Sequence, residues 1–160
     1  MKKSTEKKII KWIIISSFIF FFSWGLYTIL TKNYEIIFDK FFTAALILTV
    51  LFLYKKINLN IPITIFSLFT LTLHHLKLYG NFYFGIPFDR IMHFTAGFTL
   101  VLIFYQFLYH SERKKNPSKW KISFLSILIA AGAASMIEIV EFAGYSFLGH
   151  GEGILFYGTG

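Results

Sequence analysis

This 160-residue sequence contains no cysteine and few charged residues. Without cysteine the chain has no disulfide framework, no thiolate metal ligand and no cysteine for lipid modification. Charged residues make up 15% of the sequence, whereas soluble domains carry about 25%. The net charge is +8, but the basic residues form no stripe on a soluble face, which argues against nucleic acid as a partner. The composition therefore excludes an ordinary soluble domain.

Long apolar runs fill the sequence instead. Hydrophobic residues make up 56% of it, Phe occurs 21 times, and the mean hydropathy is +0.62. A helix that crosses the hydrocarbon needs about 20 mostly apolar residues. Five stretches reach or approach that length, namely 9–30, 36–54, 61–79, 91–109 and 120–148. The sequence therefore predicts an all-α, polytopic transmembrane bundle of about five helices, with residues 1–160 forming one integral-membrane domain.

The first two of these stretches differ from a simple apolar span, the first in its place at the N-terminus and the second in carrying charged residues. The run 9–30 is too long for the core of a cleavable signal peptide, and no A-x-A site follows it, so we expect it to remain as an anchor. The run 36–54 is interrupted by Asp39 and Lys40. We expect Asp39 to lie near the positive end of the helix dipole and Lys40 to extend outward to the membrane surface.

The distribution of basic residues predicts the orientation of the bundle, because cytoplasmic loops accumulate Lys and Arg. One side holds most of them: Lys2, Lys3, Lys7, Lys8 and Lys11 before the first span, Lys55 and Lys56 after the second, and Arg113, Lys114, Lys115, Lys119 and Lys121 after the fourth. The other side holds Lys32, Lys40 and Arg90. We therefore predict a multi-pass protein of the cytoplasmic membrane, with the N-terminus inside and the C-terminus outside.

Polar residues within the predicted spans are costly there and are commonly functional. They lie in three separate stretches: His74 and His75, then Asp89, Arg90 and His93, and finally Glu138 and Glu141. Because neighbouring spans run in opposite directions, all of them are expected in one layer below the extracytoplasmic surface. Glu138, for example, lies about 27 Å along its helix from Trp120. This convergence is the strongest sequence indication of a functional site.

Helical spacing also predicts which of these side chains share a face. The two faces consist of Asp89, His93 and Gly97 on one helix and of Ala130, Ala134, Glu138 and Glu141 on another. Small residues let helices approach closely. We therefore expect a close seam between the spans 91–109 and 120–148, which would bring Asp89 and His93 to the two glutamates.

Each polar group also has a structural interpretation. The two histidines near the end of the span 61–79 could hydrogen-bond lipid headgroups, and Lys77 could extend to the surface. Asp89 could cap its helix and pair with the next residue, an arginine. Glu138 and Glu141 could form structural ion pairs, although two carboxylates in a long uncharged run are costly to leave unpaired.

Two short motifs resemble a known family. Asp89–Phe94 resembles the D-R-x-x-H-F segment of YjdF-like bacterial inner-membrane proteins, and Glu138–Phe142 resembles their later E-x-x-E helix. The glycine-rich stretch 149–160 is similar to the lead-in to their acidic D-x-x-D motif. The layout is also similar to that of VanZ-like proteins linked to glycopeptide resistance. The resemblance implies a helical inner-membrane protein, and it implies no particular activity. The family continues into further acidic residues and a last helix, so either the sequence that ends at Gly160 is incomplete or the protein lacks those groups.

Two classes of function are consistent with these residues. In the first, the site acts on an envelope or lipid headgroup substrate. Its catalytic residues would be Asp89, His93, Glu138 and Glu141, its substrate-binding residues would be His74, His75 and Arg90, and a divalent metal ion could be held by His93, Glu138 and Glu141. In the second, the chain is a non-enzymatic assembly or envelope-resistance protein whose polar cluster is structural. A proton-coupled transporter is a weaker third, because no polar path continues along 100–107.

Overall fold

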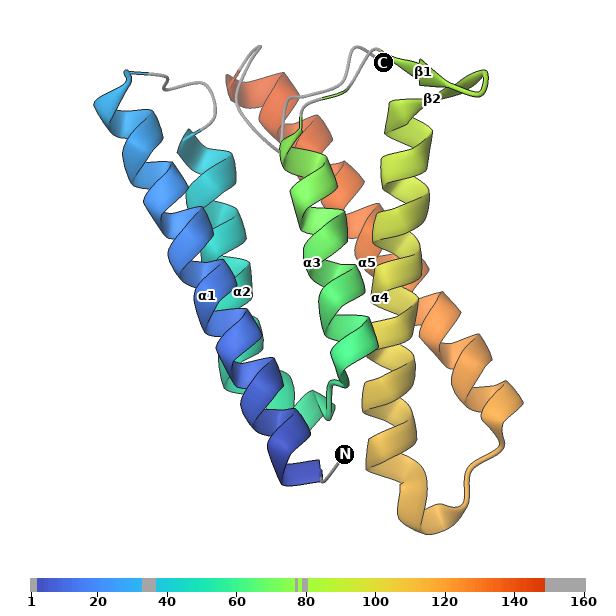
Figure 1. Ribbon diagram of the computed structural model, residues 1–160. Coiled ribbons are helices and arrows are strands. Elements are labelled where there is room, and N and C mark those ends of the chain that lie inside the picture. Colours follow the sequence, from blue (N-terminus) through green and yellow to red (C-terminus); the bar gives the residue numbers. More distant parts are fainter. Residues whose placement is uncertain (1–2, 33–36, 77, 79–80, 149–160) are drawn as a thin grey trace.

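The computed structural model describes residues 3–32, 37–76, 78 and 81–148, and these residues form a bundle of helices (Figure 1). The helices are α1 (Lys3–Leu30), α2 (Ile37–Ile57), α3 (Ile61–His75), α4 (Phe88–Glu112) and α5 (Lys119–Leu148), with a short 3-10 turn η2 at Arg113–Lys115. This confirms the all-α bundle of about five helices that the apolar runs predict. Large apolar side chains cover much of its outer surface, including Trp12, Phe52 and Phe94, as expected for helices that face lipid.

Three of the helices are long and apolar enough to cross a membrane by themselves: Lys3–Leu30, Phe88–Glu112 and the part Lys119–Ile139 of α5. The helix α3 is shorter than its predicted span, because it ends at His75 instead of residue 79. Its last turn tightens, with the Leu76 N–H donating to the Leu73 carbonyl at 3.1 Å. At 1.5 Å per residue, its 15 residues span roughly 22 Å.

The helices alternate in direction and pack as two pairs joined by α3 (Figure 1). One pair is α1 with α2, the other is α4 with α5, and α3 packs on both α1 and α4. The start of α1, the α2–α3 connection and the α4–α5 connection lie at one end of the bundle, which we call the basic end. The opposite end carries a β-hairpin of β1 (Phe82–Tyr83) and β2 (Ile86–Pro87), and we call it the hairpin end.

The hairpin was not predicted from the sequence. Its two turn residues, Phe84 and Gly85, have φ values of 52° and 77°. Two positive φ angles define a type I′ turn, whose twist matches that of paired strands. The Phe88 N–H then donates to the Asn81 carbonyl at 2.9 Å and closes the hairpin onto the first residue of α4.

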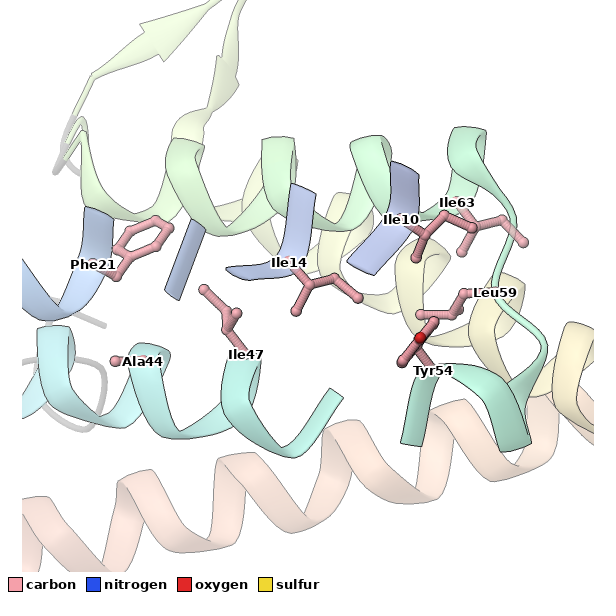
Figure 2. Close-up of a cluster of buried hydrophobic side chains, with 8 residues drawn as sticks. All are labelled: Ile10, Ile14, Phe21, Ala44, Ile47, Tyr54, Leu59 and Ile63. Carbon is pink, nitrogen blue, oxygen red and sulfur yellow. The ribbon is translucent and has the colours of Figure 1, made fainter. Parts of the chain in front are cut away.

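The apolar core lies between α1, α2 and α3 (Figure 2). It consists of Ile10, Ile14 and Phe21 from α1, Ala44, Ile47 and Tyr54 from α2, Leu59 from the connection, and Ile63 from α3. Leu59 and Ile63 lie at its basic end, and Phe21 and Ala44 lie at the other (Figure 2). Where this core ends, beside Phe21, the buried side chains become polar.

The predicted seam between α4 and α5 is only partly present. Ala130 is buried and continues a stripe with Ile122 and Ser126 at a spacing of four residues, so α5 does pack through small side chains. The prediction for Gly97 is wrong, because a Cβ added there would meet nothing within 4 Å. Four residues turn an α-helix by about 40° more than one full turn. Gly97 lies two such steps after Asp89, so it is rotated away from the face of Asp89.

Candidate functional site

Asp89, His93 and Glu138 lie together at the hairpin end of the α4–α5 pair, and we call them the His93 trio. His93 Nε2 is 3.4 Å from Asp89 Oδ1, one turn earlier on α4. His93 Nδ1 is 3.3 Å from Glu138 Oε1 on α5. The structure therefore brings three of the candidate catalytic residues into contact, and Glu138 pairs with a histidine.

The remaining candidates are placed differently. Arg90 is exposed in the first turn of α4. His74 is half-buried at the end of α3, and its ring centroid lies 5.2 Å from that of His75. The side chain of Glu141 and all of Lys77 lie outside the described residues, as does the stretch 149–160.

The geometry of the His93 trio suits proton transfer. A carboxylate faces each ring nitrogen, so a doubly protonated imidazolium can donate to both, whereas the neutral ring can donate to one. The side chains of His93, Asp89 and Glu138 are 55%, 51% and 58% exposed, so another molecule can reach them. Ion pairs with that exposure contribute about 0–1 kcal/mol to stability. The trio therefore adds little to the stability of the fold.

The same geometry bears on the predicted metal ion. Zinc ligands must converge on one point at distances of about 2.0–2.2 Å for nitrogen and oxygen. Asp89 and Glu138 face opposite nitrogens of His93, so they do not converge as they stand. Within the described residues no three His, Asp or Glu side chains form a group that could hold a metal ion. Cation binding by His93, Glu138 and Glu141 stays a prediction, since the Glu141 side chain is outside that set.

A second polar group, Lys40, Thr43 and His75, is buried between α2 and α3, and we call it the buried cluster. Lys40 Nζ is 2.7 Å from His75 Nδ1, and Thr43 Oγ1 is 2.9 Å from His75 Nε2. The three residues are 1%, 0% and 4% exposed. The Lys40 ammonium also lies 3.6 Å from the ring centroid of Trp24 on α1, where a cation–π contact helps to offset its desolvation.

The expectation that Lys40 extends outward to the membrane surface is therefore wrong. Lys40 begins a buried face of α2 that continues through Thr43 and Ile47 at spacings of three and four residues. That spacing is the sequence signal for an inward lysine. His75 was predicted to bind substrate, but its ring is buried with a hydrogen-bonding group at each nitrogen and Phe21 at a centroid distance of 4.9 Å.

The fold and the polar groups define a polytopic helical membrane protein. Residues 10–160 match the family described as "Predicted membrane protein (DUF2238)", and the chain belongs to that family. This agrees with the YjdF-like motifs at Asp89–Phe94 and Glu138–Phe142, whereas the VanZ-like layout stays a resemblance. No curated protein and no solved structure matches the chain significantly.

Proposed function

We propose that this protein is a membrane enzyme of the cell envelope, in which His93 performs acid–base chemistry on a lipid-linked or headgroup substrate. The observation that carries the proposal is the His93 trio, in which Asp89 and Glu138 face the two nitrogens of a half-exposed imidazole. In this proposal one carboxylate holds the ring in place, while the substrate displaces the other carboxylate and exchanges a proton with the nitrogen that it faced. Asp89 and Glu138 would orient the ring and stabilise its charged form.

The hairpin supports a substrate at headgroup depth. Phe82, Phe84 and Ile86 are exposed apolar side chains at its tip, with Phe84 fully exposed, and Tyr83 lies beside them. An exposed apolar patch marks a surface that contacts membrane or partner, and tyrosine is typical of the membrane interface. Because β2 leads directly into Asp89, a hairpin in the interfacial layer would hold the His93 trio level with lipid headgroups.

The orientation of the site is part of the proposal. The Lys and Arg residues gather at the basic end, which by the charge rule faces the cytoplasm. The hairpin end and the His93 trio would then face outward, toward envelope substrates. Arg90 in the first turn of α4 and His74 at the end of α3 would contribute to anionic substrate binding. In this proposal the protein lies in the cytoplasmic membrane.

The proposal is tested by complementation of a strain that lacks the gene, with envelope lipids and lipid-linked glycans profiled by mass spectrometry. We expect the deletion to change the amount of one such class, and the wild-type gene to restore it. His93→Gln and Glu138→Gln should fail to restore it while reaching wild-type levels in the membrane. Glu112→Gln is the matched control, since it removes an exposed carboxylate that pairs with Lys115 at 2.9 Å at the basic end. Full restoration by His93→Gln would refute the acid–base role.

The non-enzymatic alternative draws on a different observation. A structural polar lock must be buried, and the buried cluster meets that condition whereas the His93 trio does not. If His93→Gln lowers the melting temperature as strongly as a change in the buried cluster does, the trio is structural and the enzymatic proposal fails.

A further inference from the structure

A pocket of about 310 Å³ opens at the basic end, far from the His93 trio along the bundle. It lies between the start of α1, the α2–α3 connection and the last turns of α4, and its polar lining is Lys3, Glu6, Lys7, Asn58, Asn60 and Gln106. Its volume is at the lower end of the range of ligand pockets, which is about 300–1,000 Å³. By sequence alone, these lysines indicate only the orientation of the bundle in the membrane.

The pocket is held in shape by hydrogen bonds between segments that are distant in the sequence. Lys7 Nζ donates to the Leu59 carbonyl at 2.8 Å, and Gln106 Nε2 donates to the Asn58 carbonyl at 3.0 Å. Asn58 has a φ of 59°, which turns the connection sharply. Leu59, which carries one of the two bonded carbonyl groups, is buried in the apolar core. The three walls of the pocket are therefore fixed to one another.

The pocket is lined by more hydrogen-bond donors than the contacts within the fold use. The Lys7 ammonium has three N–H donors, of which the Leu59 carbonyl takes one. Asn60 uses its side-chain oxygen to cap α3 by accepting from the Ile63 N–H at 2.9 Å, which leaves its NH₂ group as a donor. With Lys3, these groups suit an anion that carries several acceptor oxygens, as a phosphate does.

The depth of the pocket indicates that the phosphate belongs to a lipid. Lys3 begins a helix that is apolar enough to span the membrane, and Trp12, further along α1, is exposed, as in the aromatic belts of membrane interfaces. Basic pockets between transmembrane helices on this side of a membrane bind lipid headgroups. Glu6 adds a carboxylate to the same pocket, so the lining offers a partner for a cation as well as for an anion.

We propose that this pocket binds the headgroup of an aminophospholipid, with Lys3 and Lys7 on its phosphate and Glu6 on its primary ammonium. A phosphatidylethanolamine headgroup carries both charges. Phosphatidylglycerol supplies only the anion, and phosphatidylcholine has an ammonium with no N–H to donate. Binding here is separate from the chemistry proposed for the His93 trio and does not depend on it.

The test measures melting temperatures of the purified full-length chain in mild detergent with added phosphatidylethanolamine, phosphatidylglycerol, phosphatidylcholine or inorganic phosphate. Phosphatidylethanolamine should raise the melting temperature most, because a ligand that binds only the folded state stabilises it. Lys3→Gln should reduce this shift for both phosphatidylethanolamine and phosphatidylglycerol. Glu6→Gln should remove the advantage of phosphatidylethanolamine over phosphatidylglycerol.

Lys3→Gln leaves the Lys7–Leu59 hydrogen bond in place, so it keeps the test informative if Lys7→Gln fails to fold. Lys115→Gln, which removes an exposed lysine at the same end of the bundle, is the control and should respond like the wild type. The proposal is overturned if phosphatidylcholine stabilises as well as phosphatidylethanolamine, or if inorganic phosphate alone reproduces the shift. An unchanged lipid response in both Lys3→Gln and Glu6→Gln would overturn it too.

Discussion

Lys40 Nζ lies 2.7 Å from His75 Nδ1, so a hydrogen bond links a lysine of α2 to a histidine of α3 inside the bundle. When the Lys40 ammonium donates to Nδ1, the proton of the neutral ring is on Nε2 and can be donated to Thr43 Oγ1, 2.9 Å away. The charge then lies against the face of Trp24. Each member of the buried cluster thus has a defined donor or acceptor role, which is how a charge can be tolerated at such depth.

Replacing His75 with Ala should destabilise the protein strongly. The change removes the acceptor at 2.7 Å from a lysine that is 1% exposed, and losing a hydrogen-bond partner of a buried charged group costs about 2–4 kcal/mol. Thr43→Val should cost about 1 kcal/mol, because it removes one neutral hydrogen bond. Thermal or denaturant unfolding of the purified protein measures both.

A second substitution, at Lys40, is the control for the loss of stability in His75→Ala. In the His75→Ala background, Lys40→Met should recover part of the lost stability, because it removes a buried charge that has lost one of its partners. A His75→Ala variant that unfolds at the wild-type temperature would show that the buried cluster does not hold α2 to α3.

Chelation separates cation binding from acid–base chemistry at the His93 trio. If the trio performs acid–base chemistry without a metal ion, a chelator should leave the melting temperature and metal content of the purified protein unchanged, since Asp89 and Glu138 face different nitrogens of His93 and do not converge on one point. A melting temperature that falls on chelation, with the fall absent in His93→Ala and Glu138→Gln, would instead establish the predicted divalent cation site.

Reporter fusions test the orientation on which the outward site depends. Fusions after Lys56 and Lys115, both at the basic end, should report the cytoplasm. A fusion after Phe84, in the hairpin, should report the opposite side, because short loops follow the distribution of Lys and Arg. A cytoplasmic signal at Phe84 would place the His93 trio on the inner face.

Glycine substitutions test the packing of the two helix pairs. A Cβ at Gly25 would lie 3.1 Å from the Phe41 ring, so Gly25→Leu should separate α1 from α2 and cost about 1–3 kcal/mol. Gly97→Leu is the matched control, since open space surrounds that position, and it should unfold close to the wild type. Equal loss at both positions would contradict the packing described for α4.

The sequence predicted the helices because their signal is local: an apolar run can be recognised without its neighbours, and three of the helices are long and apolar enough to cross a membrane by themselves. It also predicted the meeting of His93 with Asp89 and Glu138, since alternating directions and helical spacing determine depth and face. It failed for Lys40, because the spacing with Thr43 and Ile47 indicates only a shared face, and the acceptor that lets the lysine be buried there is 35 residues away. It failed for Gly97 because the rotation of a helix against its neighbour is a property of the whole interface.

The short helix α3 has a consequence for the surrounding lipid. Its length of roughly 22 Å is less than the hydrocarbon thickness of about 30 Å, and a stretch shorter than the bilayer is accommodated partly by local thinning. The exposed side chains of α3, such as Ile65 and Phe69, would draw the two leaflets together on that side. Lipids there would be tilted and less tightly packed. Hydrophobic mismatch would therefore lower the free energy needed to move one of these lipids out of the bilayer toward the hairpin.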